Sequence, residues 1–577
     1  MWISLLLAAA SAAPDLTTVA ERSGDLRTGR YDEVAALCAD FERAFPRRVK
    51  CTRFGTTPEG RPMLALVASA DGTLDAEAAR KKGRPVLLFQ GGIHAGEIDG
   101  KDAGFRILRD ALRGEVAPGA LRAVTVVFVP VFNVDGHERV SRWNRPNQRG
   151  PEEMGWRTTA QNLNLNRDYA KADAPEMRAM LALLRAWDPV LYVDLHVTDG
   201  AKFRHDVSIT VEPSETPGAP LHDASRKLRT DVVTILRERG HLPVEFYPAF
   251  VVDDDPTSGF HVGVAPPRLS TPYWGWKDRM GLLVETHSWH TYPERVDATY
   301  DTLVAILERA QQEAGGWLSA ARAADASRKE IGGQRVPLAF TDGEGRETIQ
   351  FLGYAYRREP STLSGGTRIT FDETEPEVWT VPLVTEVKPT LVVTAPRAGY
   401  VIPPAYAALF AEKLALHGFA TVPVKTARSG VAVEVFQAEE ARFAGTSYEG
   451  HQRVEVTGAW SRQARNISAG SLFVPVAQPG APLLLQLMEP EAPDSLVSWG
   501  FLNAVFEQKE YMESYVAEEI GEAMLRDDPA LRAAFDRALA DPAFAADPRR
   551  RLDFFYKRSP YWDPAKNVLP ILRVDAF

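Results

Sequence analysis

Four short, continuous apolar runs lie in the first half of the chain, and polar residues follow each of them. They cover residues 85–89, 124–131, 190–195 and 281–284. Apart from Thr125 and Asp194 these runs contain no polar side chain, and runs of this length and apolarity predict strands that are buried on both faces of a sheet. Helical patterns occur between these runs, at 103–113 and 174–187. This alternation predicts an α/β fold whose sheet is largely parallel and flanked by helices.

The polar residues that follow these runs form a candidate site. Gly91-Gly92 leads to His94 and Glu97 after the first run, and Asn133 follows the second. His196 follows the third run, and Glu285 follows the fourth. Ligands of parallel α/β sheets bind beyond the carboxyl ends of the strands, so we expect these side chains to lie close together.

His94, Glu97 and His196 have the composition of a catalytic zinc site. Two imidazoles and one carboxylate leave a fourth coordination position open for water. A mixed nitrogen and oxygen set suits zinc better than magnesium or calcium. Glu285 is the candidate general base, because burial at the end of an apolar strand raises the pKa of a carboxyl group. Taken singly, His94 also fits a structural histidine, and Glu285 a solvated residue at a strand end.

A second group of polar residues is suited to binding carboxylates and oxyanions. Arg167, in Asn166-Arg167, can hold a carboxylate through two parallel hydrogen bonds, with a third from Asn166. Either Arg142 or Arg145 can stabilise the oxyanion of a tetrahedral intermediate. Each of these arginines, taken alone, also fits a surface ion pair.

Together these segments resemble the zinc carboxypeptidase family typified by carboxypeptidase A, whose members are also called funnelins. The family carries His-x-x-Glu, Asn-Pro-Asp-Gly, an Arg, Asn-Arg, a distant His and a late Glu, in that order. This chain matches the order over about residues 20–325, with Asn133-Val134-Asp135-Gly136 at the second motif. The resemblance implies one Zn²⁺ per chain, held by His94, Glu97 and His196. It also implies that Glu285 is the catalytic base and acid, and that Asn166 and Arg167 bind the terminal carboxylate of the substrate. We select Arg145 as the oxyanion arginine, with Arg142 as the rival, and Tyr273 as the counterpart of the mobile tyrosine of the family.

The chain departs from the family pattern in two places near this site. Asn164 stands where the family commonly has an aspartate that hydrogen-bonds the first histidine ligand, and an amide supplies no negative charge. An insertion at 151–159 lies next to the carboxylate-binding segment. The substrate preference of the family is therefore not transferred. His417 and His451 stand alone in the second half of the chain, and we interpret them as structural.

The resulting prediction is a zinc metallocarboxypeptidase that hydrolyses the C-terminal bond of peptides carrying a free carboxylate. One alternative keeps the zinc site but acts as an amidase or peptidase on cell-wall or other non-standard peptides. Another is a peptide-binding protein that has lost turnover. The net charge of −10 argues against a nucleic-acid partner, and no apolar run reaches the length that a membrane-spanning helix needs. Composition does not address the oligomeric state.

We predict three segments along the chain. Residues 1–13 resemble a signal peptide, which predicts export to the periplasm or the cell exterior. Residues 14–328 form the zinc carboxypeptidase-like catalytic domain, and 329–577 form a C-terminal α+β region of unassigned role. Within that region, 404–416 reads as a helix, whereas 472–476 and 483–487 read as strands. Cys38 and Cys51, the only cysteines, either form a bridge or remain two buried thiols.

Overall fold

The computed structural model describes residues 14–216 and 218–577, so the predicted signal peptide at 1–13 lies outside the described residues. The N-terminal region, residues 14–328, is built on an eight-stranded sheet with the order β1-β2-β4-β3-β5-β9-β6-β7. These strands are β1 Val49–Thr56, β2 Pro62–Ala68, β3 Val86–Gly91, β4 Thr125–Val129, β5 Leu191–Thr198, β6 Val207–Glu212, β7 Pro243–Val244 and β9 Met280–His287.

The centre of this sheet is parallel and its flanks contain the antiparallel pairs. β4, β3, β5 and β9 run parallel, whereas β1–β2, β2–β4 and β6–β9 are antiparallel. The four predicted apolar runs are these four central strands. They are almost completely buried, which is why their sequences lack the alternation of a half-exposed strand. The prediction of a mixed, largely parallel sheet is therefore confirmed.

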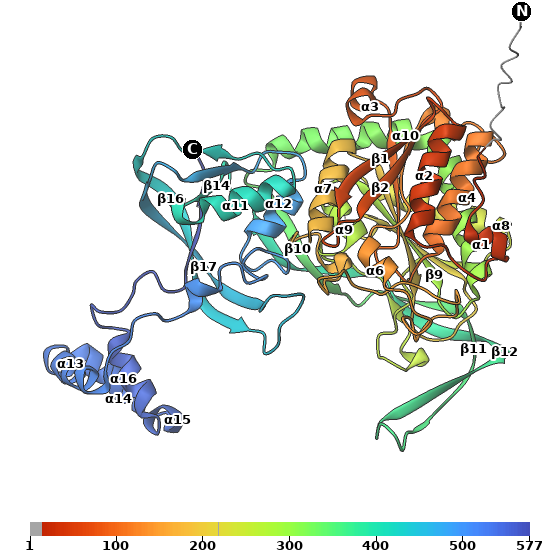
Figure 1. Cartoon of the computed structure of the whole chain (residues 1–577). Helices are drawn as coiled ribbons and strands as arrows, with labels where there is room; N and C mark the ends of the chain where they lie inside the picture. Colours follow the sequence, from red (N-terminus) through yellow and green to blue (C-terminus); the bar gives the residue numbers. More distant parts are fainter. Residues whose placement is uncertain (1–13, 217) are drawn as a thin grey trace, which may run out of the picture.

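Helices cover both faces of the sheet (Figure 1). One layer contains α2 Tyr31–Ala44, α4 Asp99–Arg113, α8 His222–Glu238 and the long α10 Tyr292–Ser327. The other face carries α7 Pro175–Trp187 and α9 Ser270–Trp276. Shorter helices of this region are α1 Val19–Ser23, α3 Ala76–Lys82, α5 Ala120–Ala123 and α6 Val134–Glu138.

The C-terminal region, residues 329–577, contains a six-stranded sheet with the order β15-β18-β14-β19-β16-β17. Its strands are β14 Gly399–Ile402, β15 Val422–Pro423, β16 Arg428–Phe443, β17 Val454–Ile467, β18 Leu472–Pro475 and β19 Val568–Val574. β19 comes last in the chain but lies in the middle of the sheet, where it pairs with both β14 and β16. The predicted helix at 404–416 is confirmed as α11 Pro404–Leu416.

The predicted strand at 483–487 is wrong, because this segment belongs to helix α12 Ala481–Met488. Every residue of the helix is buried, so its sequence shows no 3.6-residue alternation. A short, uniformly apolar run cannot distinguish a strand from a helix that is buried on all sides.

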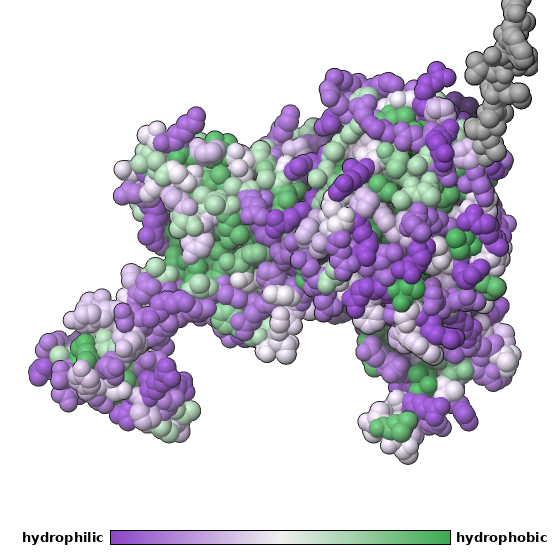
Figure 2. Space-filling view, viewed as in Figure 1, coloured by the Kyte–Doolittle hydropathy of each residue, from purple (hydrophilic) through white to green (hydrophobic). Residues whose placement is uncertain are grey.

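Two extensions project from the body of the molecule (Figure 1). One is the hairpin of β11 Arg346–Pro360 and β12 Thr367–Val384, which also pairs with the short β8 Phe260–His261. The other contains α13 Ser514–Asp527, α14 Pro529–Leu539, α15 Pro542–Ala545 and α16 Pro548–Tyr556. A separate two-stranded sheet pairs β10 Arg335–Asp342 with β13 Val387–Thr394. Figure 2 shows mostly polar residues on the visible face of the N-terminal region and apolar patches over the C-terminal sheet.

The main apolar core extends through both regions, whereas the α13–α16 helices have a small core of their own. The main core joins residues of the central strands, such as Phe128, to residues of the C-terminal sheet and α12, such as Tyr400 and Leu484. The C-terminal region is therefore packed against the N-terminal region rather than tethered to it. No helix among residues 14–216 and 218–577 is both long and apolar enough to cross a membrane.

Cys38 and Cys51 form a disulfide between α2 and β1. The cysteines are 13 residues apart, so the bridge closes a short loop. A loop of this size contributes about 3 kcal/mol to the free energy of unfolding. Of the two alternatives that the sequence left open, the structure shows the bridge.

Candidate functional site

A cavity of about 490 Å³ opens beyond the carboxyl ends of β3, β5 and β9. Its lining includes almost all of the site residues that the sequence predicts, namely His94, Glu97, Arg145, Asn166, Arg167, His196 and Glu285. The cavity therefore lies where a parallel α/β sheet places its ligands.

The loop between β3 and α4 carries the first two of these side chains. Gly92 has φ +60°, a left-handed conformation that allows the chain to turn immediately after β3. Gly96 lies directly against the side chain of Arg145. A Cβ atom at position 96 would be only 2.7 Å from Arg145 Cγ, so a larger residue would displace the arginine. The glycines that flank His94 thus create the turn and let the arginine side chain reach the site.

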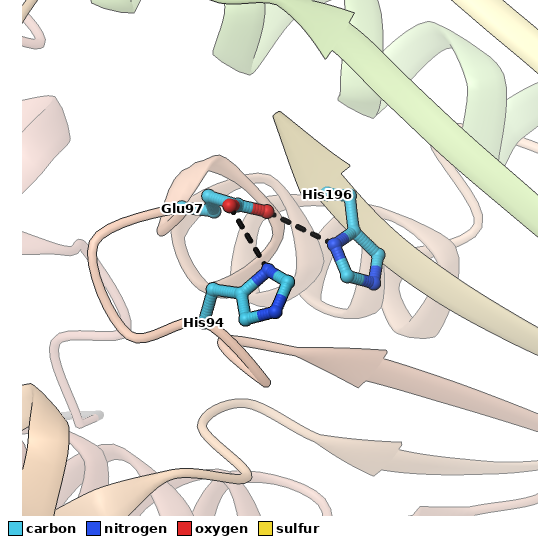
Figure 3. Close-up of side chains that lie close together, drawn as sticks. All are labelled: His94, Glu97 and His196. Carbon is cyan, nitrogen blue, oxygen red and sulfur yellow. Dashed lines mark hydrogen bonds and ion pairs between the residues drawn. The ribbon is translucent and has the colours of Figure 1, made fainter. Parts of the chain in front are cut away.

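His94, Glu97 and His196 form a compact group of possible metal ligands (Figure 3). Their candidate ligand atoms all lie within 4.8 Å of one another, and all three residues are buried. Glu97 Oε1 is 3.0 Å from His94 Nδ1, and Glu97 Oε2 is 2.9 Å from His196 Nδ1. Among the described residues, this is the one group of three or more His, Cys, Asp or Glu side chains that is close enough to hold a metal ion.

The far nitrogen of each imidazole is held by another side chain. His94 Nε2 is 3.1 Å from Asn164 Oδ1, and His196 Nε2 is 2.7 Å from Asp194 Oδ2. Each oxygen is an acceptor, so each Nε2 donates and each Nδ1 points toward Glu97. Metal-binding histidines are oriented by such partners, and a cation between the Nδ1 atoms and the carboxylate would satisfy all three groups. The residues present therefore fit zinc.

The charges around Glu97 favour its ionised form. Burial opposes ionisation, but His94 and the guanidinium of Arg145 outweigh it and hold the pKa of Glu97 well below its usual range. The amide of Val197 also donates to Glu97 Oε2 at 3.1 Å. Burial lowers the pKa of His94 to about 4, so this imidazole is neutral at physiological pH. A neutral imidazole and an ionised carboxylate are the forms that bind zinc.

Glu285 lies directly beside the metal-ligand group. β5 and β9 pair so that His196 is opposite Glu285 in the parallel register. Thr286 and Arg295 both donate to Asp99 at the start of α4, which fixes this end of β9 against the loop that carries His94. Glu285 Oε2 is buried and has no hydrogen-bond partner in the described part of the chain. Burial raises the pKa of its carboxyl group, as the sequence predicted.

The structure separates the two candidate oxyanion arginines. Arg145 lines the cavity, and its guanidinium is 2.9 Å from Glu97 Oε1. Arg142 is exposed and lies over the ring of Trp143. A second arginine, which the sequence did not single out, also lines the cavity: Arg157 is 3.4 Å from Glu97 Oε1. Arg157 belongs to the insertion at 151–159, so the insertion contributes a cation to the site.

Asn166 and Arg167 lie on a short 3₁₀ turn, η1 Leu165–Arg167, at the edge of the cavity. The side chain of Asn164 begins this turn by accepting a hydrogen bond from the amide of Asn166 at 3.0 Å. The guanidinium of Arg167 donates to the carbonyl of Asn166 at 2.7 Å, and it forms no ion pair with any carboxylate of residues 14–216 and 218–577. Arg167 thus presents an uncompensated positive charge to the cavity.

The structure places Tyr273 outside the cavity. Its side chain is only 2% exposed, and its hydroxyl pairs with Nδ1 of His417 at 3.0 Å. The tyrosine that does line the cavity is Tyr247, whose hydroxyl is 3.3 Å from Thr198 Oγ1. The sequence did not indicate Tyr247 as a site residue, because it lies in an irregular segment between β7 and β8 with no motif or periodic pattern.

The far end of the cavity carries a charged group that sequence reasoning did not identify. Arg229 of α8 forms an ion pair with Glu215 and donates to Ser214 Oγ at 3.1 Å. Glu212 is half-buried beside them, and desolvation raises its pKa to about 8, with the charge of Glu215 acting in the same direction. These residues come from β6, the loop after it and α8, which lie far apart from the motifs along the chain.

Comparison with family models shows that residues 34–216 match the model described as zinc carboxypeptidase. This match confirms, for that part of the chain, the resemblance to zinc carboxypeptidases that the motifs indicated. It includes His94, Glu97, Asn166, Arg167 and His196, but it ends before Glu285. The position of Glu285 in the site comes instead from the pairing of β9 with β5.

Several solved metallocarboxypeptidases are similar to parts of the chain. A metallo-carboxypeptidase from Burkholderia cenocepacia is 18% identical, with 49% of this chain and 69% of that chain covered and a TM-score of 0.36. Carboxypeptidase A from Helicoverpa armigera is 18% identical, with coverage of 51% and 74% and a TM-score of 0.35. A comparison with curated proteins gave no match. Because these TM-scores are low, the fold assignment rests on the order and direction of the strands.

Proposed function

We propose that this protein is a zinc-dependent carboxypeptidase that removes the C-terminal residue of peptides. One observation carries the proposal: a single cavity contains the metal-ligand group, the unpartnered carboxylate of Glu285 and the uncompensated guanidinium of Arg167. The three features correspond to a hydrolytic centre, a proton acceptor and an anchor for a negative charge.

The metal would be one Zn²⁺ per chain, held by His94, Glu97 and His196. When bound, zinc supplies Lewis-acid polarisation of a carbonyl and makes water acidic near neutral pH. Asn164 and Asp194 orient the two imidazoles toward it.

The other residues supply binding and proton transfer. Arg167 and Asn166 hold the free carboxylate of the substrate, which places the last peptide bond in the cavity. Glu285 Oε2 accepts a proton from the attacking water and returns it to the departing amine. Arg145, with Arg157 beside it, stabilises the negative charge that develops on the carbonyl oxygen.

Release of C-terminal residues from a peptide library tests this proposal. We expect zinc-dependent release that a chelator stops and added zinc restores. The same peptides with an amidated C-terminus serve as the control, and we expect them to remain intact because they offer Arg167 no charge. Cleavage of amidated peptides at the same rate would contradict the carboxypeptidase assignment. Hydrolysis of cell-wall peptides alone would favour the amidase alternative.

Arg167→Lys tests the anchor directly. A lysine keeps the charge but loses the two parallel hydrogen bonds, so we expect KM to rise at least about tenfold, which corresponds to roughly 1.5 kcal/mol of substrate binding. The rate at saturating substrate should change much less. An unchanged KM would show that the carboxylate binds elsewhere.

Export to the periplasm or the cell exterior is also part of the proposal. The Cys38–Cys51 disulfide supports it, because disulfides persist mainly in oxidising compartments. Cell fractionation together with N-terminal sequencing of the mature protein tests it. Recovery of the protein in the cytosol with both thiols free would contradict it.

A further inference from the structure

The C-terminal region contacts the segment that carries the substrate anchor. Five of its residues bind residues 164–173 or Arg268, which precedes Leu269 of the cavity wall. Asp494 pairs with Arg268 at 2.9 Å, and His417 Nε2 donates to the carbonyl of Ala170 at 3.1 Å. Lys413 of α11 donates to the carbonyl of Lys171 at 2.6 Å. The remaining two, Glu449 and His451, belong to one tight turn.

That turn, Tyr448–His451, lies in the segment that joins β16 to β17. Tyr448 and His451 form two backbone hydrogen bonds, and the central residues Glu449 and Gly450 both have positive φ, of 49° and 81°. Two central residues in the left-handed region define a type I′ hairpin turn, which is a rigid way to present a side chain. Glu449 is therefore held at a fixed position despite its strained backbone.

Glu449 binds the backbone of a residue that is central to the site. Its Oε2 accepts a hydrogen bond from the amide of Asn164 at 2.9 Å, across 285 positions of sequence. The side chain of Asn164 has two contacts of its own: one with His94 Nε2, and one with the amide of Asn166 at the start of the turn η1. One residue thus connects Glu449 both to the metal-ligand group and to the substrate anchor.

His451 provides a second attachment for the same turn. Its Nε2 is 2.7 Å from Asp173 Oδ2, and Asp173 also binds Lys413 at 2.9 Å and Lys171 at 3.2 Å. The turn is therefore fixed at both ends of the segment 164–173, and it cannot slide relative to the cavity without breaking a charged contact.

We propose that Glu449 is a positioning residue for the active site, which acts through Asn164 on His94 and on the anchor of Asn166 and Arg167. This inference rests on the proposed function for its effect on substrate, but its effect on metal binding does not depend on that function. It assigns the C-terminal region a role in catalysis that the zinc carboxypeptidase motifs do not contain.

The test uses the full-length variants Glu449→Ala and Glu449→Gln, with Glu455→Gln as a matched control. Glu455 is an exposed glutamate on the adjacent β17 and contacts none of the site residues. The zinc dissociation constant is measured by competition with a chromophoric chelator, and kcat and KM are measured on one peptide. Thermal unfolding of each variant shows whether it is folded.

For Glu449→Ala we expect the zinc dissociation constant to rise about tenfold, the lower end of the range for losing a partner that orients a metal ligand. We expect KM to rise several-fold with a smaller change in kcat. Glu449→Gln should recover part of both losses, because its amide oxygen can still accept from Asn164. Values for Glu449→Ala equal to those of Glu455→Gln would overturn the proposal.

Two further results separate the possible failures. If the wild type releases no residue from any peptide, the carboxypeptidase assignment fails, while the zinc constants still test Glu449. If Glu449→Ala does not fold, His451→Gln replaces it, since this variant removes the second attachment of the same turn. A zinc constant and a KM unchanged in His451→Gln would then count against the proposal.

Discussion

Glu285 in the N-terminal region and Glu489 in the C-terminal region are both buried glutamates, but their surroundings differ. Burial raises the pKa of each carboxyl group. Both carboxylate oxygens of Glu489 accept hydrogen bonds. Arg573 donates to each of them, and the hydroxyl of Tyr400 donates to one. Glu285 Oε2 has no hydrogen-bond partner among the described residues, and it lines the cavity. The direction of the pKa shift therefore does not distinguish the two carboxylates, whereas a free oxygen at the cavity does.

Glu285→Gln should produce the largest effect of this comparison. An amide cannot accept the proton that the proposed reaction transfers, so we expect kcat to fall by roughly 10²–10⁴-fold. Zinc binding and the unfolding temperature should not decrease, because no hydrogen bond to a described residue is lost. Single-turnover kinetics with metal analysis would check both statements. Activity within a factor of three of the wild type would remove Glu285 from the mechanism.

Glu489→Gln should show the opposite pattern. The substitution removes the nearer of the two carboxylates that pair with the buried guanidinium of Arg573 and leaves only Glu434, at 3.9 Å, so we expect the free energy of unfolding to fall by about 3 kcal/mol. Urea denaturation measures this change. The kcat per folded molecule should equal that of the wild type, since Glu489 lies outside the cavity. A stable variant with reduced kcat would contradict the distinction between the two glutamates.

His241 of the N-terminal region extends the comparison to a group with two carboxylate partners that does not line the cavity. Hydrogen bonds to Asp206 and then Asp301 raise the pKa of His241 to about 9 from the ordinary 6.5. Because the folded state binds this proton more tightly, the stabilisation is complete below about pH 6.5 and is lost as the pH rises through 9.

The expected loss is on the order of 2 kcal/mol, less than the full shift implies because solvent partly screens the pair. Urea denaturation at pH 6 and pH 9.5 measures it, and His241→Gln should abolish most of the difference. An equal pH dependence in the variant would assign the effect to other groups.

The sequence predicted the parts of the site that lie next to strong local signals. His94, Glu97, His196 and Glu285 each follow or end a largely apolar run, so the position of the strand also gave the position of the side chain. Asn166 and Arg167 belong to a compact motif that the family resemblance identified. These signals are local, and a single sequence is sufficient to read them.

The residues that the sequence misplaced or missed depend on contacts between distant segments. The side chain of Tyr273 lies in the core, where its hydroxyl hydrogen-bonds to His417, a residue 144 positions away in the sequence. Arg157 reaches the cavity only because the insertion folds back toward Glu97. The segment at 483–487 was misread because burial on all sides hides the helical period. No periodicity or spacing in the sequence reports such long-range contacts.

The position of β19 has a consequence for how the protein is made. This strand is the last to be synthesised of those described, but it joins β14 to the β16–β17 hairpin in the middle of their sheet. N-terminal parts of a protein generally fold first during synthesis. His94, Glu97 and His196 are therefore available to one another long before the sheet that presents Glu449 can close. On the roles proposed above, a growing chain can bind metal early, but it binds substrate tightly only after β19 has been synthesised.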